Sequence, residues 1–211
     1  KHVVIEKPIS LSTEECNLIQ QASLKNNKLV FCVMQNRFSP PSLWIKSVVD
    51  QNLLGEIFSI QINCFWNRDD RYYTPNHWHG NLKIDGGPLF TQFSHFIDLL
   101  YWLFGDIQIT HANFQNFNHQ HSTQFEDSGV VSFNLKNGNT LGSINYSTSV
   151  YDKNFESSIS IIGQNGSVKL GGQYMNEITY CHIKNYELPE IASSNPPNHY
   201  GNYTGSAANH P

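Results

Sequence analysis

The sequence predicts an α/β (α+β) chain: an open, mainly antiparallel sheet with helices on one face, preceded by the last βαβ unit of a doubly wound sheet. Two observations predict it. The first 35 residues alternate apolar strand, amphipathic helix and apolar strand, whereas short segments after residue 106 alternate apolar and polar side chains between turns. We therefore divide the chain into a βαβ remnant at 1–35, an α+β domain at 36–186 and a loop or mobile tail at 187–211.

The βαβ unit is predicted from three consecutive segments. Val3-Val4-Ile5 is a short apolar run, and Ser12 followed by Glu15 is a capping-box signal for a helix that extends to about Lys25. Residues 28–34 are almost continuously apolar, which is typical of a parallel strand covered on both faces. Because a single βαβ unit leaves much apolar surface in water, we expect this chain to be a fragment of a larger protein.

The pattern changes after residue 36. Pro40-Pro41 suits the first turn of a helix, the segment from Glu56 to Trp66 alternates as a strand, and one long helix is predicted from about Pro88 to Phe104. Further strands are expected at about 107–117, 128–136, 139–147, 156–163 and 166–170, with Asn137-Gly138 and Gln164-Asn165-Gly166 as hairpin turns.

Composition argues against several classes of protein. The 13 Lys and Arg residues against 17 Asp and Glu give a formal net charge of −4 without a basic run, so neither a nucleic acid nor an anionic membrane is an expected partner. No apolar stretch approaches the roughly 20 residues that a membrane helix needs. The four cysteines form no Cys-x-x-Cys pair, so we predict neither a zinc site nor disulfides, and we expect a cytoplasmic protein.

A histidine on the predicted helix is the first candidate catalytic group. Thr91, His95, Asp98 and Trp102 recur at spacings of four, three and four, which places them on one stripe of a helix. An imidazole, with an ordinary pKa of about 6.5, suits the removal of a hydroxyl proton at neutral pH. The alternative is that His95 only packs within the helix. No third ligand accompanies His95 and Asp98, so no metal site is predicted.

Lys7, within Glu6-Lys7-Pro8, is the second candidate. It follows a predicted strand and precedes a proline that restricts the backbone, so its ammonium can be held at the carboxyl end of the strand, where α/β sheets bind ligands. The alternative is an ordinary solvated lysine. Glu6 is expected to shape the turn or to contact a ligand.

These motifs together resemble the Gfo/Idh/MocA oxidoreductases, NAD(P)-dependent enzymes that act mostly on sugars, cyclitols and sugar nucleotides. The resemblance runs from Lys1 to about Tyr186 and includes Glu6-Lys7-Pro8, Asn36-Arg37-Phe38-Ser39-Pro40 and the segment from Gly86 to Asp98. It implies that a Rossmann domain with a Gly-rich phosphate loop precedes the first motif. We therefore expect the 211 residues alone to bind NAD weakly and to show no turnover.

The resemblance also implies roles for individual residues. His95 would act as base, Lys7 would polarise the substrate hydroxyl, and Glu6, Lys7 and Pro8 would contact the cofactor, NAD or NADP. Many members of the family carry Asp where this chain has Thr91, so Thr91 would orient the substrate rather than relay a proton. A subgroup that oxidises C3 of UDP-N-acetylglucosaminuronate, and commonly has a neutral residue there, looks closest.

The predicted substrate-binding residues are cationic, amide or aromatic. A diphosphate and a uronate attract Arg and Lys, whereas sugar faces and a uracil stack on aromatic rings. Each such side chain alone is more often a solvated charge or a packed ring, but several crowd into residues 65–80. His79 stands there in place of an expected Arg. The full set is Asn36, Arg37, Arg68, Tyr72, Tyr73, Trp78, Gln92 and Lys153.

We therefore predict an NAD(P)-dependent dehydrogenase that oxidises C3 of a UDP-N-acetylhexosaminuronate or a related sugar nucleotide, in cell-surface polysaccharide synthesis such as that of lipopolysaccharide. Two alternatives remain: a non-catalytic dinucleotide-binding regulator of the same fold, and an NAD-dependent glycoside hydrolase. A homo-oligomer, dimer or tetramer, is expected through the exposed face of the sheet, which we expect to be rich in Ile, Val and Phe.

Overall fold

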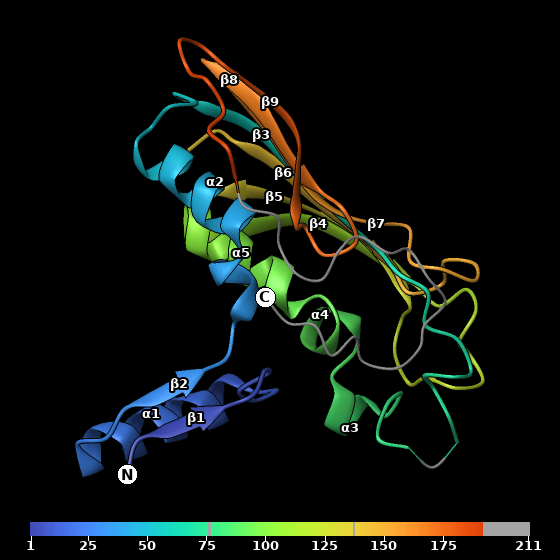
Figure 1. Ribbon diagram of the computed structural model, residues 1–211. Coiled ribbons are helices and arrows are strands. Elements are labelled where there is room, and N and C mark those ends of the chain that lie inside the picture. Colours follow the sequence, from blue (N-terminus) through green and yellow to red (C-terminus); the bar gives the residue numbers. More distant parts are fainter. Residues whose placement is uncertain (76, 137, 192–211) are drawn as a thin grey trace.

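The computed structural model describes residues 1–75, 77–136 and 138–191. A small N-terminal βαβ unit and a larger part with a broad sheet are joined through a short 3-10 helix, η1 (Gln35–Phe38) (Figure 1). Asn137 of one predicted turn and residues 192–211 of the predicted tail lie outside the described residues, and 187–191 contain neither helix nor strand. Among the described residues no helix combines the length and the apolar character needed to span a membrane.

The N-terminal unit consists of β1 (Val3–Ile5), α1 (Thr13–Asn26) and β2 (Val30–Cys32), with the two strands paired in parallel. As the capping signal predicts, the Ser12 hydroxyl accepts a hydrogen bond from the Glu15 N–H at 3.1 Å. α1 buries none of its residues, and Val4, Leu18 and Leu24 are 69%, 64% and 75% exposed. The described chain therefore leaves apolar surface of this unit uncovered.

The larger part is built on a seven-stranded sheet with the order β4-β5-β6-β3-β7-β8-β9. Only β3 and β6 pair in parallel among these neighbours, and the other pairs are antiparallel. The predicted fold class is confirmed. The strands are β3 (Ile57–Phe65), β4 (Ile107–Gln115), β5 (Ser128–Leu135), β6 (Leu141–Ser147), β7 (Glu156–Gly163), β8 (Gly166–Gly171) and β9 (Glu177–Ile183).

One strand, β9, is absent from the sequence prediction. It lies at the edge of the sheet, and most of its side chains are exposed or only partly buried. A strand that faces little of the core leaves no clear alternation in the sequence, so the pattern did not reveal it.

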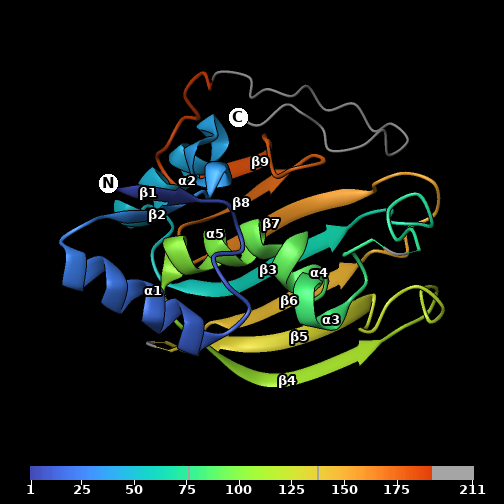
Figure 2. The ribbon, with the colours of Figure 1, turned by 90° about the horizontal axis from the view of Figure 1, so that it is seen from below.

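The helices α2 (Pro40–Asp50) and α5 (Ser94–Phe104) cover one face of the sheet, as predicted (Figure 2). Between sheet and helices lies the core. Its largest fully buried aliphatic side chains include Ile60 and Ile62 of β3, Ile159 and Ile161 of β7, and Leu99 and Leu100 of α5. This packing fixes α5 on the sheet, and with it the segment that leads into α5.

The single helix predicted from Pro88 to Phe104 is wrong, because it is two helices. α4 (Pro88–Thr91) ends before Gln92 and Phe93, and α5 begins at Ser94. Phe93 is 1% exposed, and its ring packs against Trp66 with centroids 5.1 Å apart. The chain bends where this ring enters the core, so Thr91 is not on the same helix as His95. A further short helix, α3 (Leu82–Asp85), precedes α4.

The uncovered face of the sheet is polar along its middle strands. Asn63 faces Asn145 and Ser158 across the neighbouring strands, and the Asn145 Nδ2 donates to the Asn63 Oδ1 at 2.9 Å. Gln61 likewise faces Ser143. The expectation that Ile, Val and Phe dominate this face is wrong, because most of those side chains point to the face that the helices cover.

Two neighbouring isoleucines of β7 test this assignment of faces. Ile161 is 0% exposed and Ile162 is 49% exposed. In the full-length protein we expect Ile161→Ala to lower the free energy of unfolding by about 2–5 kcal/mol, because it leaves a cavity in the core. Ile162→Ala should change it by only about 0.5 kcal/mol. Urea unfolding measures both, and equal losses would contradict the assignment.

Candidate active site

Lys7 joins the two parts of the molecule. Glu6, Lys7 and Pro8 directly follow β1, at the carboxyl end of the parallel pair, and the Lys7–Pro8 peptide is cis. The Lys7 ammonium donates a hydrogen bond to the main-chain carbonyl of Thr91, at the end of α4. The predicted lysine is therefore held at a fixed point of the larger part rather than extended into solvent.

The surroundings of Lys7 make its ammonium easier to deprotonate. Burial, the largest influence, lowers the pKa of Lys7, and the nearby positive charge of Arg68 lowers it further. The negative charges of Glu6 and Asp85 act in the opposite direction without cancelling the effect of burial. Lys7 thus lies in a partly dry, charged environment, which is typical of functional lysines.

Two glycines shape the turn that brings Asp85 to Thr91. Asp85 ends α3, and Gly86 and Gly87 follow with φ of 72° and 95°, a backbone region that favours glycine. A Cβ on Gly86 would lie only 2.7 Å from the Leu11 Cδ2. After this reversal the Thr91 Oγ1 is 2.6 Å from the Asp85 Oδ1.

A network of polar side chains extends from Asp85. The Gly80 N–H donates to the Asp85 Oδ2 at 2.9 Å, and the Thr91 Oγ1 is 2.7 Å from the Gln92 Oε1. The Gln92 amide nitrogen lies 2.7 Å from the Tyr72 hydroxyl. Three predicted site residues, Tyr72, Thr91 and Gln92, are therefore brought together with Asp85.

Arg68 adds a buried positive charge beside this network. It is 8% exposed, and its guanidinium carbon lies 4.7 Å from the Trp66 ring centroid and 5.2 Å from that of Tyr72. One of its nitrogens donates to the Asn67 carbonyl at 2.6 Å. Its charge lowers the pKa of Lys7, so the two cations share one region of the molecule. A guanidinium held between aromatic rings is suited to bind a carboxylate or a phosphate.

His95 lies in the first turn of α5, four residues after Thr91, and is 8% exposed. Asp98, on the next turn, is held by Arg37: its carboxylate oxygens lie 2.7 Å and 2.5 Å from the Arg37 Nε and Nη2. This bidentate pair balances the charge of Arg37. The contact therefore favours a structural role for Arg37 over the predicted role in substrate binding.

The other predicted substrate residues occupy different surroundings. Asn36 lies in η1, and Lys153 is exposed. Tyr73 is 3% exposed, with its ring edge-on to that of His119 at 5.0 Å, as in a packed core. Trp78 is half exposed and lies against His79, whose ring stacks on Tyr72 with centroids 4.0 Å apart. Of the predicted aromatic residues, Tyr72 is thus the one with a direct contact to Gln92.

Sequence reasoning missed two buried carboxylates. Asp85 is 0% exposed and central to the network, but in the sequence it was only a residue before a glycine pair. Asp127 is 0% exposed, and its Oδ2 lies 3.0 Å from the Nδ1 of His119. A carboxylate directly before Gly-Gly was the one usable signal, because such a turn can direct a side chain backwards.

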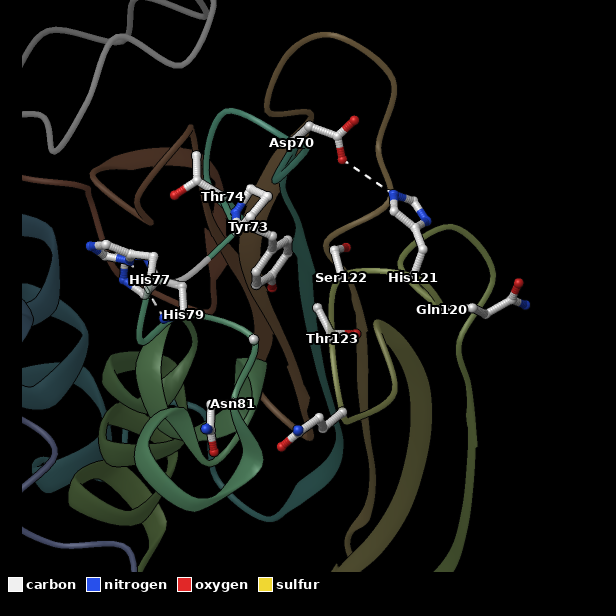
Figure 3. A pocket seen from close by; sticks show the side chains of 13 residues that line it. Asp70, Tyr73, Thr74, His77, His79, Asn81, Gln120, His121, Ser122 and Thr123 are labelled. Carbon is white, nitrogen blue, oxygen red and sulfur yellow. Dashed lines mark hydrogen bonds and ion pairs between the residues drawn. The ribbon is translucent and has the colours of Figure 1, made fainter.

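A polar hollow of about 680 Å³ adjoins the network (Figure 3). It is lined by residues from two segments, one from Asp70 to Pro75 and His77 to Asn81 and the other from Gln120 to Gln124, and the Asp70 Oδ1 lies 3.4 Å from the His121 Nε2 among them. It meets the network at His79 and Gly80 but is lined by neither Lys7 nor His95. Within the described ranges, no group of three or more His, Cys, Asp or Glu side chains is arranged to hold a metal ion.

Comparisons with known proteins identify the family of this chain. A family model described as the GFO/IDH/MocA C-terminal domain matches residues 43–169. A curated protein of Synechocystis sp., named "Uncharacterized oxidoreductase sll0816", is 28% identical over 195 residues, which cover 86% of this chain and 51% of that protein. The chain thus spans about half the length of this relative.

Two similar solved structures are WlbA dehydrogenases crystallised with NADH and UDP-GlcNAcA. The enzyme from Bordetella pertussis is 32% identical with a TM-score of 0.83, and the match covers 89% of this chain and 53% of that one. The enzyme from Chromobacterium violaceum is 34% identical with a TM-score of 0.81, and covers 88% and 53%. Because the matching domain model spans more than half of the sequence, the chain belongs to the GFO/IDH/MocA family.

Proposed function

We propose that the protein containing this chain is an NAD(P)-dependent dehydrogenase that oxidises C3 of a UDP-N-acetylhexosaminuronate or a related sugar nucleotide, for cell-surface polysaccharide synthesis. The observation that carries the proposal is the Lys7 ammonium bound to the Thr91 carbonyl, four residues before His95. The likeness to two dehydrogenases crystallised with NADH and UDP-GlcNAcA supports the substrate class.

Oxidation of a secondary alcohol needs a base for the hydroxyl proton and a group that stabilises the oxygen as negative charge develops. In this proposal His95 accepts the proton and Lys7 donates a hydrogen bond to the same oxygen. Thr91 and Gln92 orient the sugar, and Arg68 binds its carboxylate or a phosphate. The bound nicotinamide supplies the acceptor for the hydride.

The residues at the end of β1 fit the reactive end of such a cofactor. Glu6, Lys7 and Pro8 follow a parallel strand at its carboxyl end, the usual ligand edge of an α/β sheet. The exposed apolar side chains of β1 and α1 offer a face against which further strands and helices of a dinucleotide-binding domain can pack. We therefore assign the phosphate-binding loop to a part of the protein other than these residues.

The proposal includes a cytoplasmic homo-oligomer. All four cysteines are free thiols, in keeping with a reducing compartment. The uncovered sheet face, with its Asn and Ser side chains, offers hydrogen-bonding groups to a second copy.

Replacement of His95 by Gln tests the base. In the full-length protein, His95→Gln should lower kcat with UDP-GlcNAcA and NAD by roughly 100- to 10,000-fold, because glutamine fills similar space but accepts no proton at neutral pH. Formation of NADH, followed by absorbance, measures the rate. The matched control is His111→Gln, at an exposed position of β4, which should retain full activity. Equal rates for the two variants would refute the assignment.

The pH dependence tests Lys7. Because burial lowers the pKa of Lys7, its ammonium loses its proton at a lower pH than an ordinary lysine, so kcat/KM should decline on the alkaline side below the usual lysine range. An arginine stays charged throughout that range. Lys7→Arg should therefore remove this alkaline decline while lowering the maximal rate, whereas the exposed control Lys28→Arg should leave the profile as it is. An unchanged alkaline limb in Lys7→Arg would exclude Lys7 as its source.

A further inference from the structure

Asp85 combines complete burial with contacts that lead directly to the proposed site. Its side chain is 0% exposed. One carboxylate oxygen accepts the Gly80 N–H at 2.9 Å, and the other lies 2.6 Å from the Thr91 Oγ1. Neither partner carries a charge. A fully buried carboxylate is costly, so its position calls for an explanation.

The Thr91 hydroxyl has one hydrogen and three acceptors within reach. The Asp85 Oδ1 is at 2.6 Å, the Gln92 Oε1 at 2.7 Å and the Gly87 carbonyl oxygen at 3.1 Å. The carboxylate oxygen is the nearest of these acceptors and the strongest by type, so the hydrogen points to Asp85. The oxygen of Thr91 then has its lone pairs available for another donor.

Gln92 can supply that donor. A half-turn of its amide exchanges the oxygen and the nitrogen, which occupy nearly the same space. The amide nitrogen then donates to the Thr91 Oγ1, and the amide oxygen accepts from the Tyr72 hydroxyl. Each of these two distances is 2.7 Å. Every donor in the series faces an acceptor, and all hydrogens run in one direction: Tyr72 to Gln92 to Thr91 to Asp85.

We propose that Asp85 is a positioning residue that sets the direction of this series of hydrogen bonds and so fixes Thr91 and Gln92 beside Lys7. The catalytic consequence rests on the proposed dehydrogenase function. The Thr91 carbonyl receives the Lys7 ammonium, and the Thr91 hydroxyl is bound to Asp85, so one residue connects the carboxylate to the lysine.

The charge of Asp85 also acts on Lys7 directly. It raises the pKa of Lys7, against the effect of burial, as do Glu6 and the Cys32 thiol, whereas Arg68 lowers it. Removal of the Asp85 charge alone should therefore make Lys7 lose its proton at a lower pH. A carboxylate whose charge did not reach Lys7 would have no such effect.

Asp85→Asn is the sharpest variant because it preserves the number of hydrogen bonds. With its oxygen towards the Gly80 N–H and its nitrogen towards Thr91, the asparagine donates where the aspartate accepted. The Thr91 hydroxyl then donates to Gln92, and the direction of the whole series reverses. In the full-length protein we expect kcat to fall by roughly 10- to 100-fold, through misplacement of the reacting groups, with a smaller change in KM.

A second readout does not depend on activity. The Lys7 ammonium can be followed by ¹⁵N NMR in full-length protein labelled at lysine, with its signal assigned by its loss in Lys7→Arg. In Asp85→Asn the Lys7 titration midpoint should move to lower pH. If no sugar nucleotide is oxidised, the proposed function fails, but the direction of this midpoint still decides the role of Asp85.

Asp127→Asn is the matched control for burial. Asp127 is also 0% exposed and accepts the Phe117 N–H at 3.1 Å, the Asn118 N–H at 2.8 Å and the Ser128 hydroxyl at 2.8 Å. It belongs to the connection between β4 and β5, so its replacement should lower stability without moving the Lys7 midpoint. If Asp85→Asn moves neither the midpoint nor kcat more than Asp127→Asn does, the proposal is overturned.

Thr91→Val decides the case in which Asp85→Asn does not fold. It interrupts the series between Asp85 and Gln92 but keeps the carboxylate. The proposal is supported if kcat falls by roughly 10-fold or more, as expected for misplaced groups, while the Lys7 titration midpoint stays unchanged. Wild-type kcat in a folded Thr91→Val variant excludes it.

Discussion

The hydrogen bond from the Lys7 ammonium to the Thr91 carbonyl is the interaction on which the site depends. It spans two parts of the chain that are 84 residues apart, and it holds a cation where burial disfavours charge. Such a cation persists only where acceptors and negative charges surround it. The carbonyl at the end of α4 and the carboxylates of Glu6 and Asp85 provide these groups, so the lysine and the larger part position each other.

The sheet and its helices give this contact a rigid base. α5 is fixed by its buried leucines, and Phe93 bends the chain just before it, so that α4 ends with its Thr91 carbonyl towards Lys7. The glycine pair at 86–87 then directs Asp85 back to Thr91. Core packing and a turn that only glycine adopts easily therefore combine to place groups that no single helix could bring together.

Much of the fold follows from local patterns in the sequence. Alternation revealed β3 to β8, and the capping signal at Ser12 located α1, because each of these features acts over a few neighbouring residues. The break between α4 and α5 was not predictable in the same way. The segment has neither Gly nor Pro after Pro88, and the bend depends on the burial of Phe93 against Trp66, a contact between distant residues. Residues such as Arg37 were judged by type, whereas the fold decides their partner, Asp98.

A crystal structure of the full-length protein with NADH and UDP-GlcNAcA would show directly where Lys7 and His95 lie relative to the sugar. We expect the Lys7 ammonium and the His95 imidazole both to lie within about 2.6–3.2 Å of the C3 hydroxyl of the sugar. A complex in which either group points away from that hydroxyl, with the sugar bound elsewhere, would contradict this expectation.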